Sequence, residues 1–130
     1  MIDDETYQRL QAPGVVALVG DRIFPLTAAE TAPVPFIRYM PVSRAQFVAD
    51  ALDQIATPVR SRVQIDAYAD TYGVVRQVAE AITIALEGWG SPTEGTVRSV
   101  TLYSETTADE STEFQKRYRV SQDWYVIHDH

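Results

Sequence analysis

The chain has 130 residues, 45% of them hydrophobic and 22% charged, which is typical of one soluble globular domain spanning residues 1–130. Its 18 acidic and 11 basic residues give a formal net charge of −7, which argues against a protein that clamps DNA through its phosphates. It has no cysteine and no apolar run near the ~20 residues that span a bilayer, so we expect neither disulfides nor a membrane partner. The acidic start, MIDDETYQRL, is unlike a secretory signal.

The first third of the chain predicts two short helices followed by an exposed connection. Acidic residues fill the first turn of a helix from Asp3 to about Leu10, and Pro13-Gly14 interrupts its pattern. The apolar stretch VVALV then predicts a second helix that Gly20 closes. Residues 25–35 show little periodicity and indicate a loop, with a Pro-rich segment that docks a partner as the alternative.

Two strands are predicted next. Residues 35–42 are aromatic and β-branched, and we expect their pairing to stop near Met40 because Pro41 cannot donate to a ladder. Residues 44–56 fit either a helical turn or an irregular segment and are left unassigned. Residues 58–69 alternate with the two-residue period of a half-buried strand. The apolar side of this strand holds Val59, Val63, Ile65 and Ala67, and the polar side holds Arg60, Arg62, Gln64 and Asp66.

An amphipathic helix is predicted from about Thr71 to Glu87, with Asp70 or Thr71 as its N-cap and Gly88 as its stop. Its apolar positions are Val75, Val78, Ala79, Ile82, Ala85 and Leu86. Along an extended strand, Asp66 and Asp70 lie ~13 Å apart, farther than the ~5–9.5 Å of paired glycosidase carboxylates. We therefore predict that Asp66 is a solvent-facing or interface charge and that Asp70 belongs to the helix cap.

The last third predicts a turn at residues 88–95, a strand at 96–105 with imperfect alternation and a possible bulge, and a polar connection at 106–113. A final strand alternates from Phe114 onward, with Trp124 toward the core and Tyr125 on the other side. These elements predict an α+β fold with about four mostly antiparallel strands and helices packed on one face.

No pattern for catalysis, a cofactor or a metal emerges from the sequence. His128, Asp129 and His130 are metal-binding residue types, but we expect a frayed tail at the last three positions, and no second His or Cys cluster completes a site. A nucleophile elbow, a P-loop and a dinucleotide fingerprint are all missing from the sequence. We predict no catalytic residue, no cofactor and no metal ligand.

Four segments, in this order, resemble the tail completion or tail terminator family of long-tailed bacteriophages, which also occurs in prophages and gene transfer agents. They are LVGDRIFP at 18–25, VPFIRY at 34–39, RVQIDAYADTYGVVRQVAEAI at 62–82 and YRVSQDWYVI at 118–127. The resemblance extends from about Leu10 to His128. The sequence departs from the family at Pro13-Gly14 and in its acidic and histidine-rich end.

The resemblance implies a small tail-terminator-like subunit that assembles into a homo-oligomeric ring, usually a hexamer, at the head-proximal end of the tail tube. Such a ring stops tube polymerisation and joins the tail to the head, so the implied partners are the tail tube protein and a head-closure or adaptor protein. DNA passes through without specific binding. The implied location is the neck of the virion tail, after assembly in the bacterial cytoplasm. The family has no catalytic residues, so the resemblance implies no enzyme activity.

A ring needs two different, complementary patches on each subunit. We hypothesise that a basic sheet face meets an acidic loop between neighbours; the alternative is solvated surface charge. The basic set is Arg60, Arg62, Arg117 and Arg119, and the acidic set is Glu105, Asp109, Glu110 and Glu113. Two other functions remain open: another neck component, such as a head-closure or adaptor subunit, and a small α+β hydrolase or ligand-binding module built around a carboxylate such as Asp66.

Overall fold

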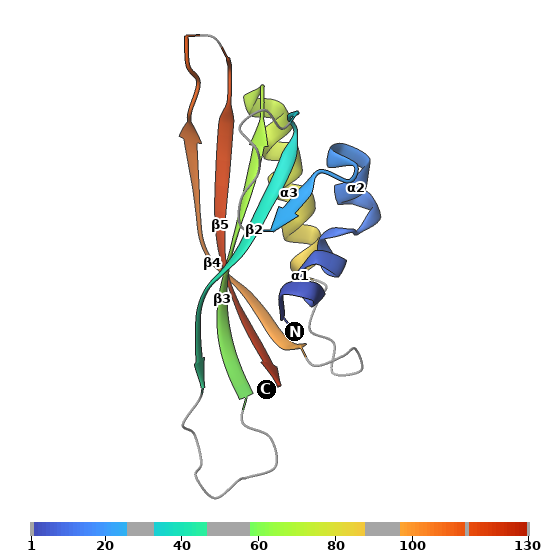
Figure 1. The fold of residues 1–130 in the computed structure, drawn as a ribbon, viewed down its shortest axis with the longest axis vertical. Helices are drawn as coiled ribbons and strands as arrows, with labels where there is room; N and C mark the ends of the chain where they lie inside the picture. Colours follow the sequence, from blue (N-terminus) through green and yellow to red (C-terminus); the bar gives the residue numbers. More distant parts are fainter. Residues whose placement is uncertain (1, 26–32, 47–57, 88–96, 114, 130) are drawn as a thin grey trace, which may run out of the picture.

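A computed structural model of the protein describes residues 2–25, 33–46, 58–87, 97–113 and 115–129. These residues form three helices and one five-stranded sheet, which confirms the predicted α+β class. Figure 1 shows long, twisted strands with the helices on one side of them. The predicted turn at 88–95, including Gly88 and Trp89, lies outside the described residues.

The sheet has the strand order β1-β2-β3-β5-β4, and its neighbours are antiparallel except for β1 and β2, which are parallel. The strands are β1 (Ile23–Pro25), β2 (Phe36–Gln46), β3 (Pro58–Ala69), β4 (Val97–Asp109) and β5 (Tyr118–Asp129). The strand missing from the sequence prediction is β1. Its three residues are too few to show a period of two.

The prediction that pairing of β2 stops near Met40 was wrong. The ladder with β3 continues to Gln46, with a register shift between Pro41 and Ser43. β1 ends opposite Tyr39, so within the described residues Pro41 lies where β2 is the edge of the sheet. A residue without an N–H is tolerated at such an edge. The unassigned residues 44–46 complete β2, whereas 47–56 lie outside the described residues.

The helices are α1 (Ile2–Leu10), α2 (Pro13–Val19) and α3 (Tyr72–Glu87), close to their predicted ranges, but Pro13-Gly14, predicted as the interruption, lies inside α2. Pro13 begins α2, because the first position of a helix does not need its N–H. Gly20 closes α2 with a φ of +62°, and its amide donates to the carbonyl of Val16 at 2.8 Å. Thr71 is the N-cap of α3, since its hydroxyl accepts from the amide of Val74 at 3.2 Å.

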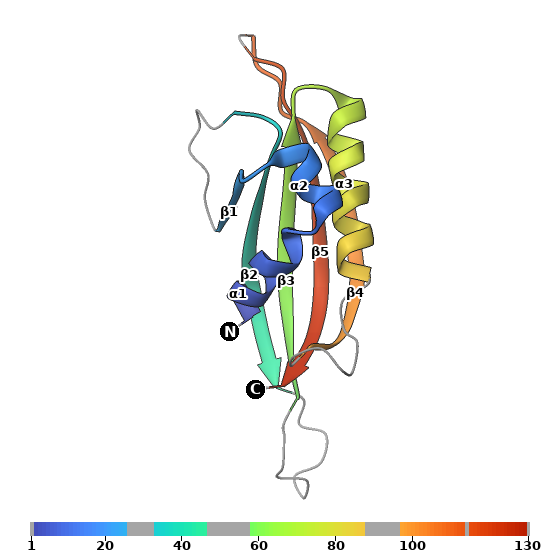
Figure 2. The ribbon, with the colours of Figure 1, turned by 90° about the vertical axis from the view of Figure 1, so that its right-hand side faces the viewer.

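All three helices pack on the same face of the sheet, and the core lies between them (Figure 2). The six predicted apolar positions of α3 are all buried, and Trp124 is the largest fully buried side chain. Leu10, Val15 and Val19 add the buried side of α1 and α2. The helix-covered face of β3 and β5 supplies Val63, Ile65, Ala67, Val120 and Val126.

One buried polar side chain, Gln122, ties this core together. Its amide nitrogen lies 3.0 Å from both the hydroxyl of Thr83 on α3 and a carboxylate oxygen of Glu105 on β4. Its amide oxygen accepts from the indole N–H of Trp124 at 3.0 Å. Because a buried polar group is costly unless it is paired, these bonds fix how α3 sits on β4 and β5.

The strand predictions near the C-terminus need three corrections. β4 contains two register shifts, which confirms the bulge, but it runs to Asp109, so the connection predicted at 106–113 begins later. Threonine is a good strand former, and Thr106 and Thr107 extend the ladder. β5 begins at Tyr118 rather than at residue 114, which lies outside the described residues. His128 is not part of a frayed tail; it is buried in β5, and its Nε2 lies 2.8 Å from the hydroxyl of Ser61.

Asp66 is fully buried, so the prediction that it faces solvent or an interface was wrong. Arg38 on β2 and Ser121 on β5 lie directly opposite it in the register. The guanidinium of Arg38 donates to the carboxylate at 2.5 Å, the hydroxyl of Ser121 at 2.6 Å and the amide of Gln64 at 3.0 Å. Long neighbouring side chains cover this carboxylate although its strand face carries no helix. Asp70 is exposed.

We expect Thr71→Ala to lower the free energy of unfolding by about 1 kcal/mol, because the amide of Val74 loses its cap. Urea denaturation measures the change. Asp70→Ala is the matched control, and in about 0.5 M salt, where helix-dipole effects are screened, it should change stability by less than about 0.5 kcal/mol. A larger loss for Asp70→Ala than for Thr71→Ala would contradict the assigned cap.

We expect Asp66→Ala to lower the free energy of unfolding by about 2–4 kcal/mol, because it leaves the partly buried Arg38 without its counter-charge. Asp123→Ala is the control on the same face. Asp123 also pairs with an arginine, but its side chain is 20% exposed, and we expect a loss of about 1 kcal/mol. Equal losses in urea denaturation would show that burial of Asp66 is not what makes its pair important.

Candidate assembly interface

The sheet face opposite the helices carries the predicted basic residues Arg60, Arg62 and Arg119. Within the described residues no helix lies on this face, as Figures 1 and 2 show from two sides. We call it the open sheet face. Its side chains come from alternate positions of β2, β3 and β5 and from the bulged part of β4: Phe36, Arg38, Met40, Arg60, Arg62, Gln64, Asp66, Tyr68, Tyr103, Arg119, Ser121, Asp123 and Tyr125.

Arg62 is already paired within the chain. Its guanidinium donates to the carboxylate of Asp123 at 3.2 Å, and the hydroxyl of Ser104 donates to the same carboxylate oxygen at 3.2 Å. The hydrogen bond and the charge of Asp123 raise the pKa of Arg62, so its guanidinium stays charged. Arg62 therefore reaches a partner only by sharing or leaving Asp123.

Arg60 belongs to an aromatic cluster on this face, near the start of β3 and the end of β5. Its guanidinium lies 4.7 Å from the ring centroid of Tyr125, which meets Tyr103 edge to face at 5.1 Å. Tyr103 is 64% exposed and sits at the second bulge of β4. Tyrosine and arginine are enriched at protein interfaces. The sequence prediction missed Tyr103, because its orientation depends on the position of the bulge.

The structure brings one predicted basic residue and one predicted acidic residue together inside the same chain. Arg119 on β5 lies 3.0 Å from the carboxylate of Glu110, and both side chains are about one-third exposed. Glu105 lies instead on the helix-covered side, where Arg76 of α3 donates to it at 2.5 Å and Gln122 contacts its other oxygen. Glu105 is thus separated from Arg60, Arg62 and Arg119 by the thickness of the sheet.

The β4–β5 hairpin projects beyond the ends of the helices and the other strands (Figure 1). We call residues 110–113 and 115–117 the hairpin arm. Its backbone is held by bonds from the amide of Glu110 to the carbonyl of Arg117 at 2.8 Å and from Thr112 to Gln115 at 2.7 Å. Beside the arm, the hydroxyl and the amide of Ser111 hydrogen-bond to Asp109 and lower its pKa. Glu113 is exposed, and no partner for its carboxylate is found among the described residues.

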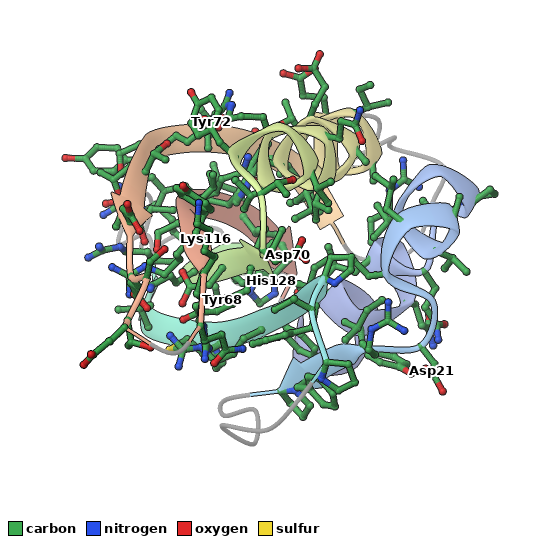
Figure 3. All side chains as sticks on the ribbon, turned by 90° about the horizontal axis from the view of Figure 1, so that it is seen from above. Asp21, Tyr68, Asp70, Tyr72, Lys116 and His128 are labelled. Atoms are coloured by element: carbon green, nitrogen blue, oxygen red, sulfur yellow. The ribbon has the colours of Figure 1, made fainter. Side chains whose placement is uncertain are left out.

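Arg117 leaves the arm one residue before β5 begins and lies over two aromatic rings. Its guanidinium is 4.4 Å from the centroid of Tyr68 and 5.3 Å from that of Phe36. The two rings are stacked at 4.7 Å, and Arg38 approaches Tyr68 at 5.7 Å. Figure 3 views this end of the molecule, with Tyr68 on β3 and Lys116 on the arm labelled. Sequence reasoning missed this arrangement, because it depends on the pairing of Phe36 with Tyr68.

The described residues contain no group of three or more His, Cys, Asp or Glu side chains placed to hold a metal ion. Asp129 lies in β5, and His130 is outside the described residues. None of the helices in the described ranges is both long enough and apolar enough to cross a membrane.

Comparison with solved structures identified the same fold in a chain described as "Virion of native gene transfer agent (GTA) particle". The match has a TM-score of 0.68 and 18% sequence identity, and it covers 96% of this chain and 92% of that one. A comparison with curated proteins gave no match. Residues 5–129 match the family described as "Tail completion protein gp17". Because this match takes in the sheet, the helices and the hairpin arm, the chain belongs to the tail completion protein gp17 family.

Proposed function

We propose that this protein forms a ring that caps the head-proximal end of a tail tube, ends tube polymerisation and joins the tail to the head. The observation that carries the proposal is the family match over residues 5–129. The family match makes the protein a structural tail protein. What we propose in addition is its position at the head-proximal end of the tube and its role as a cap. The fold shared with a chain of a gene transfer agent virion is consistent with such a particle.

Capping a tube requires complementary surfaces and no bond chemistry. A closed ring forms when one surface of a subunit fits a different surface of its neighbour and the rotation returns to its start. This chain offers two unlike surfaces, a helix-covered side and an open sheet face with a projecting arm (Figures 1 and 2). We propose a hexamer, whose rims would meet the tail tube protein on one side and a head-closure or adaptor protein on the other.

DNA would pass through this ring in the neck of the particle without specific binding. The net charge of −7 favours such a role, because acidic surfaces repel phosphates. A lumen lined mainly by arginine would contradict this part of the proposal. Assembly would take place in the cytoplasm of the bacterial host before the tail joins the head.

The enzymatic alternative loses its main candidate residue in this fold. A carboxylate that acts on a substrate must be reachable, but Asp66 is fully buried and accepts hydrogen bonds from three side chains. Its bonds hold strands together. The site thus favours structural work over hydrolysis.

Deleting the gene from its phage or gene transfer agent tests the proposal through particle morphology. We expect tails of abnormal and widely varying length, unattached to heads, in electron micrographs, because nothing stops tube growth. Supplying the wild-type gene in trans should restore joined particles of uniform length. Tails of normal length that fail to join heads would indicate the alternative neck component. Normal particles after deletion would overturn both structural roles.

A further inference from the structure

We infer that neighbouring copies of this chain contact each other through Arg117 of one copy and Glu113 of the next. This inference rests on the proposed ring. It narrows a set of eight charged residues to one pair, by asking which of them already have partners inside a single chain.

Most of the predicted interface charges are engaged within the chain. Arg62 pairs with Asp123 and Arg119 pairs with Glu110, whereas Arg60 lies near the end of β3 that is far from the hairpin arm. Glu105 pairs with Arg76, and Asp109 accepts from Ser111. Arg117 and Glu113 remain: among the described residues, neither has an ion-pair partner. They are the charges with the most to gain from a contact with another copy.

Arg117 is held in place for recognition before any partner arrives. Its guanidinium rests against the stacked rings of Phe36 and Tyr68, and its Nε is buried without a hydrogen-bond partner in the described part of the chain. A guanidinium fixed on aromatic rings binds carboxylates with less loss of side-chain freedom than a mobile one. The free donors of Arg117 therefore form a prepared site for a carboxylate.

The charges around this site favour an acidic partner. Arg38 is neutralised by Asp66, and Arg119 by Glu110. Arg117 and the exposed Lys116 are then the basic residues of the arm that have no ion-pair partner among the described residues. A carboxylate from another copy would complete the pairing of Arg117, and complementary charges make association selective.

The hairpin arm of a second copy supplies such a segment. Glu113 lies at the exposed turn of the arm, which the bonds between Thr112 and Gln115 hold in shape. Arg117 lies at the base of the same arm, so both groups are at the end of the molecule that projects in Figure 1. In the proposed ring the long strands are inclined to the ring axis, which brings the arm tip of one copy level with the arm base of the next. The arm tip of one copy can then reach the arm base of its neighbour.

The test mixes two charge-reversed variants, Arg117→Glu and Glu113→Arg, with purified tail tubes from the same particle. The measurement is the fraction of tube ends that carry a ring in electron micrographs. We expect each variant alone to cap at least about tenfold fewer ends than wild type, since like charges then meet at every contact. An equal mixture should restore capping, because alternating subunits in an even-numbered ring pair opposite charges at every contact.

Restoration by mixing separates a contact between copies from one inside a copy. Arg119→Glu and Glu110→Arg form the control pair, because these residues pair within one chain. Any loss they cause should be restored in the double variant and not by mixing. Thermal unfolding of each variant shows whether it is folded. Glu113→Arg changes an exposed side chain, so its loss of capping cannot be assigned to misfolding.

Three outcomes would overturn the inferred contact, and a fourth would overturn the proposed function as well. If either single variant caps as many tube ends as wild type, the inferred contact between copies does not exist. Restoration in the Arg117→Glu/Glu113→Arg double variant alone, without restoration by mixing, would place the pair inside one copy. If the Arg117→Glu variant forms normal rings in solution but does not cap tubes, Arg117 contacts the tube protein and not a second copy. If wild-type protein caps no tubes, the proposed function itself fails.

Discussion

The buried carboxylate of Asp66 is the interaction on which the rest of the open sheet face depends. It accepts hydrogen bonds from β2, from its own strand β3 and from β5, and so joins the three adjacent strands at one point. A buried charge is tolerable only when it is paired and fully hydrogen-bonded. This requirement fixes Arg38 beside Tyr68, and it keeps Arg38 from competing for other acids. Arg117 is thereby left as the arginine on these rings that has no acid partner in the described residues.

The two faces of the sheet in this protein differ in what lies on them. The helix-covered face holds the apolar core, and Gln122 locks α3 onto it. The open sheet face carries aromatic rings and ion pairs between neighbouring strands, such as Arg38–Asp66 and Arg62–Asp123. Because these pairs already satisfy most charges, a neighbour in the proposed ring would meet a surface with few unpaired charges. Rigid, prepared surfaces lose less entropy on binding than mobile ones.

Much of the fold could be predicted because its signals are local. The period of α3, the presence of a break between two short helices and the alternation of β3 are all readable from neighbouring residues. The three-residue strand β1 and the continuation of β2 past Pro41 were missed, because both depend on which strand lies alongside. Asp66 was misassigned for a related reason. Alternation gives the side of the sheet, but burial on that side depends on Arg38 and Ser121 across the register.

The charged residues of the interface could be predicted as types but not as partners. The sequence places Arg119 and Glu110 nine positions apart, and only the hairpin register brings them together.

The most direct measurement of the central idea is a cryo-electron microscopy map of purified tail tubes after addition of the purified protein. Our account predicts a closed ring of copies at one end of each tube, with the hairpin arms between neighbours. Binding along the tube wall, or single copies scattered without a ring, would contradict it.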